Sequence, residues 1–167
     1  MVDSPELDLT WAKKLSLDSL DFYLAKMTSD HLPEVISIAD STAKNPWSET
    51  HFADSISNAW VLKNNDLVVG FAVIAMAADE AELHNMAIHP QWQGQGLGSI
   101  FLYTLIESLP YTIKMMYLEV RVTNFTAIRL YSGLGFEKIA EREGYYRTEL
   151  GSEDALIMRM SLHGQRE

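Results

Sequence analysis

Cysteine is absent from this chain of 167 residues. Its absence excludes disulfide bonds, thiolate metal sites and a cysteine nucleophile. The five histidines are scattered without the paired spacing of metal ligands, so the sequence predicts no metal site. Long apolar stretches are also lacking, because the longest run, residues 67–78, is shorter than the ~20 residues that a membrane helix needs. The amino-terminal residues carry early acidic side chains and do not resemble a signal peptide, so we expect a cytoplasmic protein without membrane attachment.

Positive charge is scarce, with 13 Lys and Arg residues against 23 Asp and Glu residues and a net charge of −10. This balance argues against direct nucleic-acid binding, which depends on neutralising phosphates with basic side chains. Two interpretations remain open: the acidic surface serves only solubility, or it suits a basic partner or substrate.

The apolar content of 47% is that of a globular protein, and the length is that of one domain. We expect residues 1–20 to be an N-terminal extension and residues 21–167 to be a single domain. The hydrophobic patterns predict two helices near 29–42 and after Ser48, a β-hairpin around 64–66 and a strand over 81–90. A helix over 97–109, a strand over 114–122, a helix over 124–134 and two closing strands follow. This order predicts an α/β (α+β) fold, a mixed central sheet flanked by helices with a parallel crossover through the 97–109 helix.

The stretch QGQGLG, residues 93–98, places three glycines at the start of a predicted helix. The first N–H groups of a helix lack partners within the helix, and glycines let an anion approach the backbone closely. The pattern therefore predicts a phosphate or pyrophosphate site, with a tight turn that only reverses the chain as the simpler alternative. The residues of this predicted site are Gln93, Gly94, Gln95, Gly96, Leu97, Gly98 and Ser99.

Two other phosphate motifs fit this loop less well. A P-loop would end in Gly-Lys followed by Ser or Thr, and the loop has no lysine. A dinucleotide fingerprint needs Gly-x-Gly-x-x-Gly and an acidic residue about 20 residues later. Glu119 could supply the acid, but the third glycine comes one residue early. A third possible ligand is the pyrophosphate of coenzyme A.

Several segments together resemble a known family. QGQGLG fits a Gln/Arg-x-x-Gly-x-Gly/Ala signature, and PWSE (46–49), LEVR (118–121), N..AI.LY..LGF (124–136), YY (145–146) and EDALIM (153–158) follow the same family order. The chain thereby resembles the GCN5-related N-acetyltransferase (GNAT) superfamily, and within it the RimI-type branch of ribosomal-protein-alanine N-acetyltransferases, over about residues 20–162. The resemblance implies the GNAT fold and acetyl-CoA as co-substrate, with no metal. One departure is Gly94, where RimI relatives often carry arginine.

The resemblance implies direct acetyl transfer to an amine, which needs a base for the amine and an acid for the leaving thiolate. Glu119 is the candidate base; the alternative is a structural carboxylate paired with Arg121. Tyr131 is the candidate acid, because a phenol is a donor at neutral pH and its helix face points inward. The alternative is a core tyrosine.

Other binding residues follow from the same resemblance. The backbone of Met86, Ala87 and Ile88 is expected to hold the pantetheine arm, and Asn124 is expected to cap its helix and to contact the cofactor. As walls of a peptide groove we expect Trp47, Tyr145 and Tyr146.

The predicted function is acetylation of the N-terminal α-amino group of a protein, by resemblance the N-terminal alanine of a small-subunit ribosomal protein. An acetyltransferase for small amines and a non-catalytic acyl-CoA-binding module are the alternatives. A monomer is favoured. The sequence leaves open the range of targets, acetylation of lysine and the role of residues 1–20.

Overall fold

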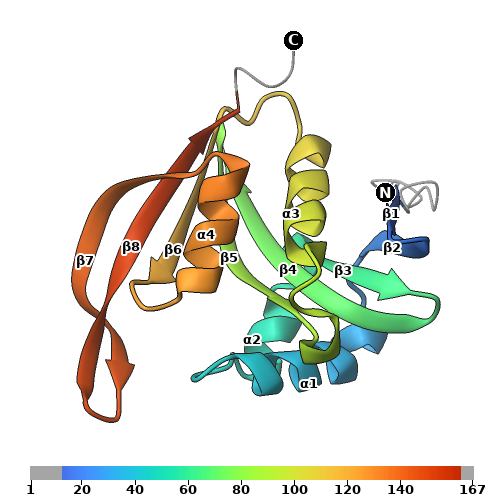
Figure 1. Cartoon of the computed structure of the whole chain (residues 1–167), viewed down its shortest axis with the longest axis horizontal. Coiled ribbons are helices and arrows are strands. Elements are labelled where there is room, and N and C mark those ends of the chain that lie inside the picture. The colour runs from blue at the N-terminus through green and yellow to red at the C-terminus, as the bar shows by residue number, and fades with distance from the viewer. Residues whose placement is uncertain (1–12, 163–167) are drawn as a thin grey trace, which may run out of the picture. The chain divides into compact units, whose positions relative to one another are not determined.

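A computed structural model describes residues 13–162, in which eight strands form one mixed sheet in the order β1-β2-β3-β4-β5-β6-β8-β7 (Figure 1). The chain divides into two compact units, one of residues up to 72 with 87–97 and one of residues 73–86 with those from 98 onward. The strands β4 (Leu67–Ala77) and β5 (Glu80–Ile88) each contribute to both units. The predicted mixed sheet flanked by helices is confirmed.

The first unit contains the elements from β1 to β3 and the short turn that follows β5. They are β1 (Lys13–Leu17), β2 (Leu20–Lys26), the 3-10 turn η2 (Ser29–His31), α1 (Leu32–Thr42), α2 (Glu49–Asp54), η3 (Ile56–Asn58), β3 (Ala59–Asn64) and η4 (Pro90–Trp92). α2 begins directly after Ser48 as predicted, and Ser48 caps it, since its side chain accepts a hydrogen bond from the backbone N–H of His51 at 3.1 Å. The core of this unit includes the edge-to-face pair of Phe52 and Phe71, both 0% exposed.

The two N-terminal strands correct the predicted element order, which began with helices. β1 pairs antiparallel with β2 from Lys13–Leu24 to Leu17–Leu20, and β2 pairs antiparallel with β3. Part of the expected extension thus belongs to the sheet, while residues 1–12 lie outside the described residues. The inward positions of β2 are only Phe22 and Leu24. Such a short alternation is a weak strand signal, and pairing with the distant β3 supplies the rest.

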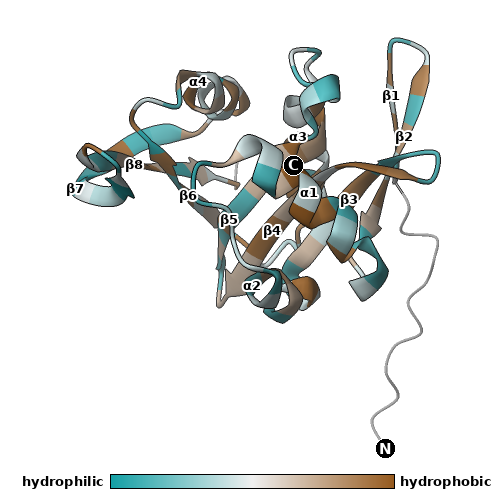
Figure 2. Cartoon of the chain, turned by 90° about the horizontal axis from the view of Figure 1, so that it is seen from below, coloured by the Kyte–Doolittle hydropathy of each residue, from teal (hydrophilic) through white to brown (hydrophobic). Residues whose placement is uncertain are grey.

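The second unit contains α3 (Leu97–Ser108, from its second residue), β6 (Met115–Arg121), α4 (Phe125–Leu134), β7 (Glu137–Thr148) and β8 (Gly151–Ser161). β5 and β6 pair in parallel over Glu80–Leu83 and Met115–Leu118, which confirms the predicted crossover through α3. β8 lies antiparallel between β6 and β7. In both cartoon views α4 lies over this β6–β8–β7 part of the sheet (Figures 1 and 2).

Burial explains why two of these strands differ in sequence pattern. Residues 68–74 of β4 are buried on consecutive positions, so both faces of this strand are covered and it is hydrophobic along its length (Figure 2). β6 instead alternates, with Met116, Leu118 and Val120 buried and the residues between them half-buried. The half-buried face carries Glu119, as the period of two predicts.

Candidate functional site

The glycine loop before α3 has an exposed backbone in an unusual conformation. Gly94 and Gly96 have φ of +77° and +82°, a region that strongly favours glycine, and a Cβ added at either would meet no atom within 4 Å. Residues 93–96 are exposed, and α3 begins directly after them. The open glycines and the unpaired N–H groups at the start of a helix fit an approaching anion.

Side chains anchor the start of this loop. The Gln93 amide donates to the carbonyl of Ile88 at 2.8 Å, and Nδ1 of His89 accepts from the backbone N–H of Gln91 at 3.1 Å. Gln93 is thus tied to the end of β5. The three predicted pantetheine contacts also lie there, with Met86 and Ala87 half-buried and Ile88 buried. β5 extends to Ile88, beyond the segment that pairs with β6.

Glu119 is partly solvated, and its partner differs from the predicted alternative. Nη1 of Arg142 donates to Oε1 of Glu119 at 2.7 Å, and the Glu119 side chain is 21% exposed. A hydrogen bond with Glu119, followed by the charge of this carboxylate, raises the pKa of Tyr145. Arg121 binds Glu153 instead, so the suggested pairing of Glu119 with Arg121 is wrong.

Glu119 lies in the wall of an open pocket of about 340 Å³ within the second unit. Glu80 and Glu82 from β5 and Tyr117 from β6 also line this pocket. Three carboxylates around one pocket favour a positively charged group, and an α-amine is largely protonated below its pKa of roughly 7.7–8.0. The pocket therefore suits an amine better than an anion.

Tyr131 lies on the half-buried face of α4, with its ring edge against Phe136 at 5.9 Å between centroids. Burial raises the pKa of Tyr131 to about 12, with a smaller contribution from Tyr146. A raised pKa keeps the phenol protonated through the neutral range. Tyr131 is therefore a hydrogen-bond donor there, as a general acid must be.

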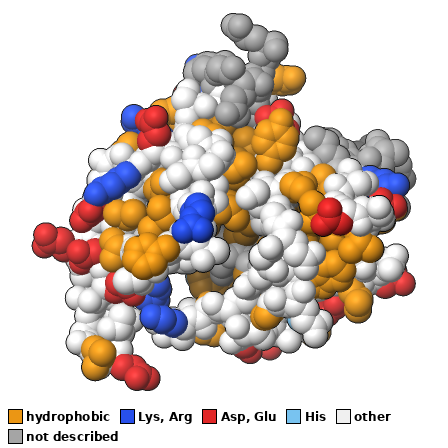
Figure 3. Space-filling model, viewed as in Figure 1, with side chains coloured by type: hydrophobic (Ala, Val, Ile, Leu, Met, Phe, Trp, Pro, Cys, Tyr) orange, Lys and Arg blue, Asp and Glu red, His pale blue; other side chains and the backbone are white. Residues whose placement is uncertain are grey.

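The two adjacent tyrosines of β7 each lie against an arginine. The guanidinium carbon of Arg142 is 4.1 Å from the ring centroid of Tyr145, and that of Arg121 is 4.2 Å from the ring centroid of Tyr146. The two tyrosine rings meet edge to face at 5.0 Å. On the face drawn in Figure 3, hydrophobic and basic side chains lie next to one another over the β7–β8 part of the chain.

A β-bulge produces this arrangement. Between Arg142 and Tyr146 the β7 strand advances four residues while its partner β8 advances two, from Ala155 to Glu153. Gly144 has φ of +61° within the bulge, and its N–H donates to Asp154 at 2.8 Å. Our sequence interpretation did not use Gly144, although a glycine inside a strand is a known bulge signal.

Asn124 and Trp47 have local roles that the structure shows directly. Oδ1 of Asn124 accepts from the N–H of Ala127 at 3.2 Å, which confirms the predicted cap of α4. Trp47, in the first unit, stacks on His51 with 3.6 Å between ring centroids and an interplanar angle of 13°. Trp47 therefore packs against α2, and a role in a peptide groove stays a prediction.

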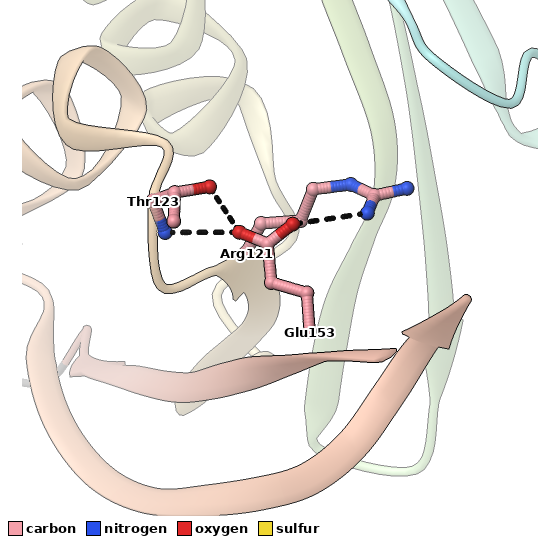
Figure 4. A network of polar contacts seen from close by, with 3 residues as sticks. All are labelled: Arg121, Thr123 and Glu153. Carbon is pink, nitrogen blue, oxygen red and sulfur yellow. Dashed lines mark hydrogen bonds and ion pairs between the residues drawn. The ribbon is translucent and has the colours of Figure 1, made fainter. Parts of the chain in front are cut away.

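A polar network of Arg121, Thr123 and Glu153 was not predicted from the sequence. Oε2 of Glu153 accepts from Nη1 of Arg121 at 3.3 Å, while Oε1 accepts from the backbone N–H of Thr123 at 3.2 Å and from its hydroxyl (Figure 4). Arg121 and Glu153 are 32 positions apart, and only strand pairing brings them together.

Within residues 13–162, no three or more His, Asp or Glu side chains are grouped as metal ligands would be. None of the helices in that range is both long and apolar enough to cross a membrane.

Comparison with known proteins agrees with the fold and with the motifs. The [ribosomal protein bS18]-alanine N-acetyltransferase of Escherichia coli K12 is 36% identical over 143 residues, which are 83% of this chain and 97% of that protein. The crystal structure of the ribosomal-protein-S18-alanine N-acetyltransferase from Escherichia coli matches with a TM-score of 0.77 and 35% identity, over 87% of this chain and 98% of that one.

A more distant structure shares the fold alone: yncA from Salmonella typhimurium, solved with its cofactor acetyl-CoA. Its TM-score is 0.73 at 18% identity, over 87% of this chain and 96% of that chain. The model of the acetyltransferase (GNAT) family matches residues 22–136. The resemblance inferred from the motifs is therefore confirmed, and the chain belongs to the acetyltransferase (GNAT) family.

Proposed function

We propose that this acetyltransferase transfers acetyl from acetyl-CoA directly to the N-terminal α-amino group of a protein. We further propose that its substrate is a ribosomal protein of the bS18 kind with an N-terminal alanine. The proposed substrate rests on the 36% identity to the bS18-alanine N-acetyltransferase of Escherichia coli over 97% of that protein. The net charge of −10 supports a basic protein as the partner.

The loop of residues 93–99 fits the pyrophosphate of acetyl-CoA. Gly94 and Gly96 leave open space where side chains would stand, and the start of α3 offers backbone N–H groups. Backbone donors would replace the arginine that RimI relatives often have at position 94. The end of β5, from Met86 to Ile88, would hold the pantetheine arm, and Asn124 would contact the cofactor while it caps α4.

Glu119 and Tyr131 transfer different protons in the proposed reaction. Acetyl-CoA supplies the thioester: the amine nitrogen bonds to its carbonyl carbon as the bond from carbon to sulfur breaks. Glu119 accepts the proton that the amine loses, directly or through water, and Tyr131 donates a proton to the departing sulfur. Arg142 and Tyr145 hold the carboxylate of Glu119 in place while leaving it accessible from the pocket.

A substrate panel tests the proposed function. The enzyme and acetyl-CoA are incubated with a peptide that begins with alanine and contains lysine, with the same peptide blocked at its N-terminus, and with a polyamine and an aminoglycoside. Fragmentation mass spectrometry should find acetyl on the α-amine of the free peptide only. Acetylated polyamine or aminoglycoside with an unmodified peptide would establish a small-amine enzyme instead, and no product from any substrate would support a binding module.

A glycine substitution tests the cofactor loop separately. Gly96→Ala should weaken acetyl-CoA binding about tenfold, a loss of about 1.4 kcal/mol, because the new Cβ stands where the phosphate approaches. Isothermal titration calorimetry gives the affinity. Gly151→Ala is the matched control, since Gly151 also has positive φ, +134°, and open space around it but is the first residue of β8. Both variants should lose stability through backbone strain, so equal acetyl-CoA affinities would reject the loop as the phosphate site.

A further inference from the structure

The Arg121–Glu153–Thr123 network does not include the residues assigned to proton transfer, and its two charged side chains are largely buried. The side chains of Arg121 and Glu153 are 17% and 11% exposed, and Glu153 does not line the pocket that contains Glu119. Both carboxylate oxygens of Glu153 accept hydrogen bonds within the protein (Figure 4). A charged group held in this way rigidifies its surroundings, because the ion pair and its hydrogen bonds depend on one geometry.

The network spans the connection between two candidate catalytic elements. β6 carries Glu119, α4 carries Tyr131, and Thr123 lies in the short segment between them. Glu153 binds the N–H and hydroxyl of Thr123, and the N–H of the preceding Val122 donates to the Asp154 carbonyl at 3.1 Å. β8 therefore fixes the turn that determines where α4 begins.

The second arm of the network reaches an aromatic ring. Glu153 holds the guanidinium of Arg121, which lies over the ring of Tyr146. Burial raises the pKa of Tyr131, and the charge of Tyr146 adds to that shift. One carboxylate thus restrains both the start of α4 and a ring that influences Tyr131.

We propose that Glu153 is a positioning residue for acetyl transfer, which holds the β6–α4 connection through Thr123 and the ring of Tyr146 through Arg121. Glu153 has no contact with substrate in this proposal, and it acts by placing Tyr131 against the leaving sulfur. The inference rests on the proposed role of Tyr131 as the acid.

The test is a double-mutant cycle on kcat. Glu153→Gln keeps an oxygen for Thr123, but its amide nitrogen cannot accept from Arg121, so kcat should fall about tenfold, less than the ~10²-fold cost of a 1 Å misplacement. The KM for acetyl-CoA should stay within about twofold. In a Tyr131→Phe background the same substitution should change kcat less than about twofold, because its effect passes through the missing hydroxyl.

Controls separate positioning from general destabilisation. Glu141→Gln alters an exposed glutamate on β7 that pairs with Lys138, and kcat should not change. Arg121→Lys keeps the positive charge but loses the planar stack on Tyr146, so it should lower kcat and show the same dependence on Tyr131. If Glu153→Gln fails to fold, Arg121→Lys tests the proposal in its place.

Two results would overturn the inference: a folded Glu153→Gln or Arg121→Lys enzyme with wild-type kcat, or equal losses with and without the Tyr131 hydroxyl. Equal losses would mean that the network only stabilises the fold. If Tyr131→Phe alone keeps the wild-type kcat, the proposed role of Tyr131 fails instead, and the cycle shows this independently.

Discussion

Glu119→Gln is expected to lower kcat about 100-fold at neutral pH, at the low end of the 10²–10⁴-fold typical of general acid–base catalysis. The glutamine keeps the shape of the side chain but cannot accept a proton, and a water relay limits the loss. Acetyl-CoA affinity should stay within about twofold, because the predicted cofactor contacts lie elsewhere. The deficit should shrink as pH rises, because more of the α-amine, with a pKa of roughly 7.7–8.0, then arrives neutral.

The matched control is Glu82→Gln, the same change in the wall of the same pocket. Glu82 interacts with His84, with 3.4 Å between Oε2 and Nε2, and it has no assigned part in proton transfer. The Glu82 variant should retain most of the wild-type kcat, and the loss of one pocket carboxylate should appear in the KM for the amine instead. Pre-steady-state rates must first show that chemistry limits turnover. A Glu119→Gln enzyme that then works at the wild-type rate would make Glu119 a structural partner of Arg142.

Tyr131→Phe should lower kcat by about 100-fold as well, but with a different dependence on pH. The substitution removes only the hydroxyl and keeps the ring contact with Phe136. Because the pKa of Tyr131 is raised to about 12, wild-type enzyme keeps the proton needed for the thiolate throughout the range from neutral pH to about pH 10. The deficit should therefore stay nearly constant across that range, and a pH–rate profile of kcat measures it.

Tyr103→Phe provides the control for this experiment, since it removes a phenol hydroxyl from a residue of α3 that is 53% exposed. Its kcat should match the wild type at each pH. A Tyr131→Phe deficit that disappears at high pH would contradict the assignment of Tyr131 as the acid. The hydroxyl would then affect the amine rather than the leaving group.

Local patterns predicted much of the second unit. The alternation of β6 set which side chains are buried, Asn124 indicated the start of α4, and the apolar spacing from Leu97 indicated α3. Each of these signals lies within one element, so neighbouring residues carry it. β2 was missed because only Phe22 and Leu24 mark its buried face, and its partner β3 lies more than 30 residues away, as in the pair of Lys26 with Trp60.

The family, the order of elements from α1 onward, and the candidate base and acid could all be predicted from the residues alone. The partners of those two side chains depend on the fold. Arg142 rather than Arg121 binds Glu119, and Glu153 binds Arg121 across β6 and β8. These partners are 23 and 32 positions apart, and their meeting depends on strand order and on the bulge at Gly144. Register arises when separate strands pair, so no short stretch of sequence contains that information, and a glycine such as Gly144 indicates only where a bulge can form.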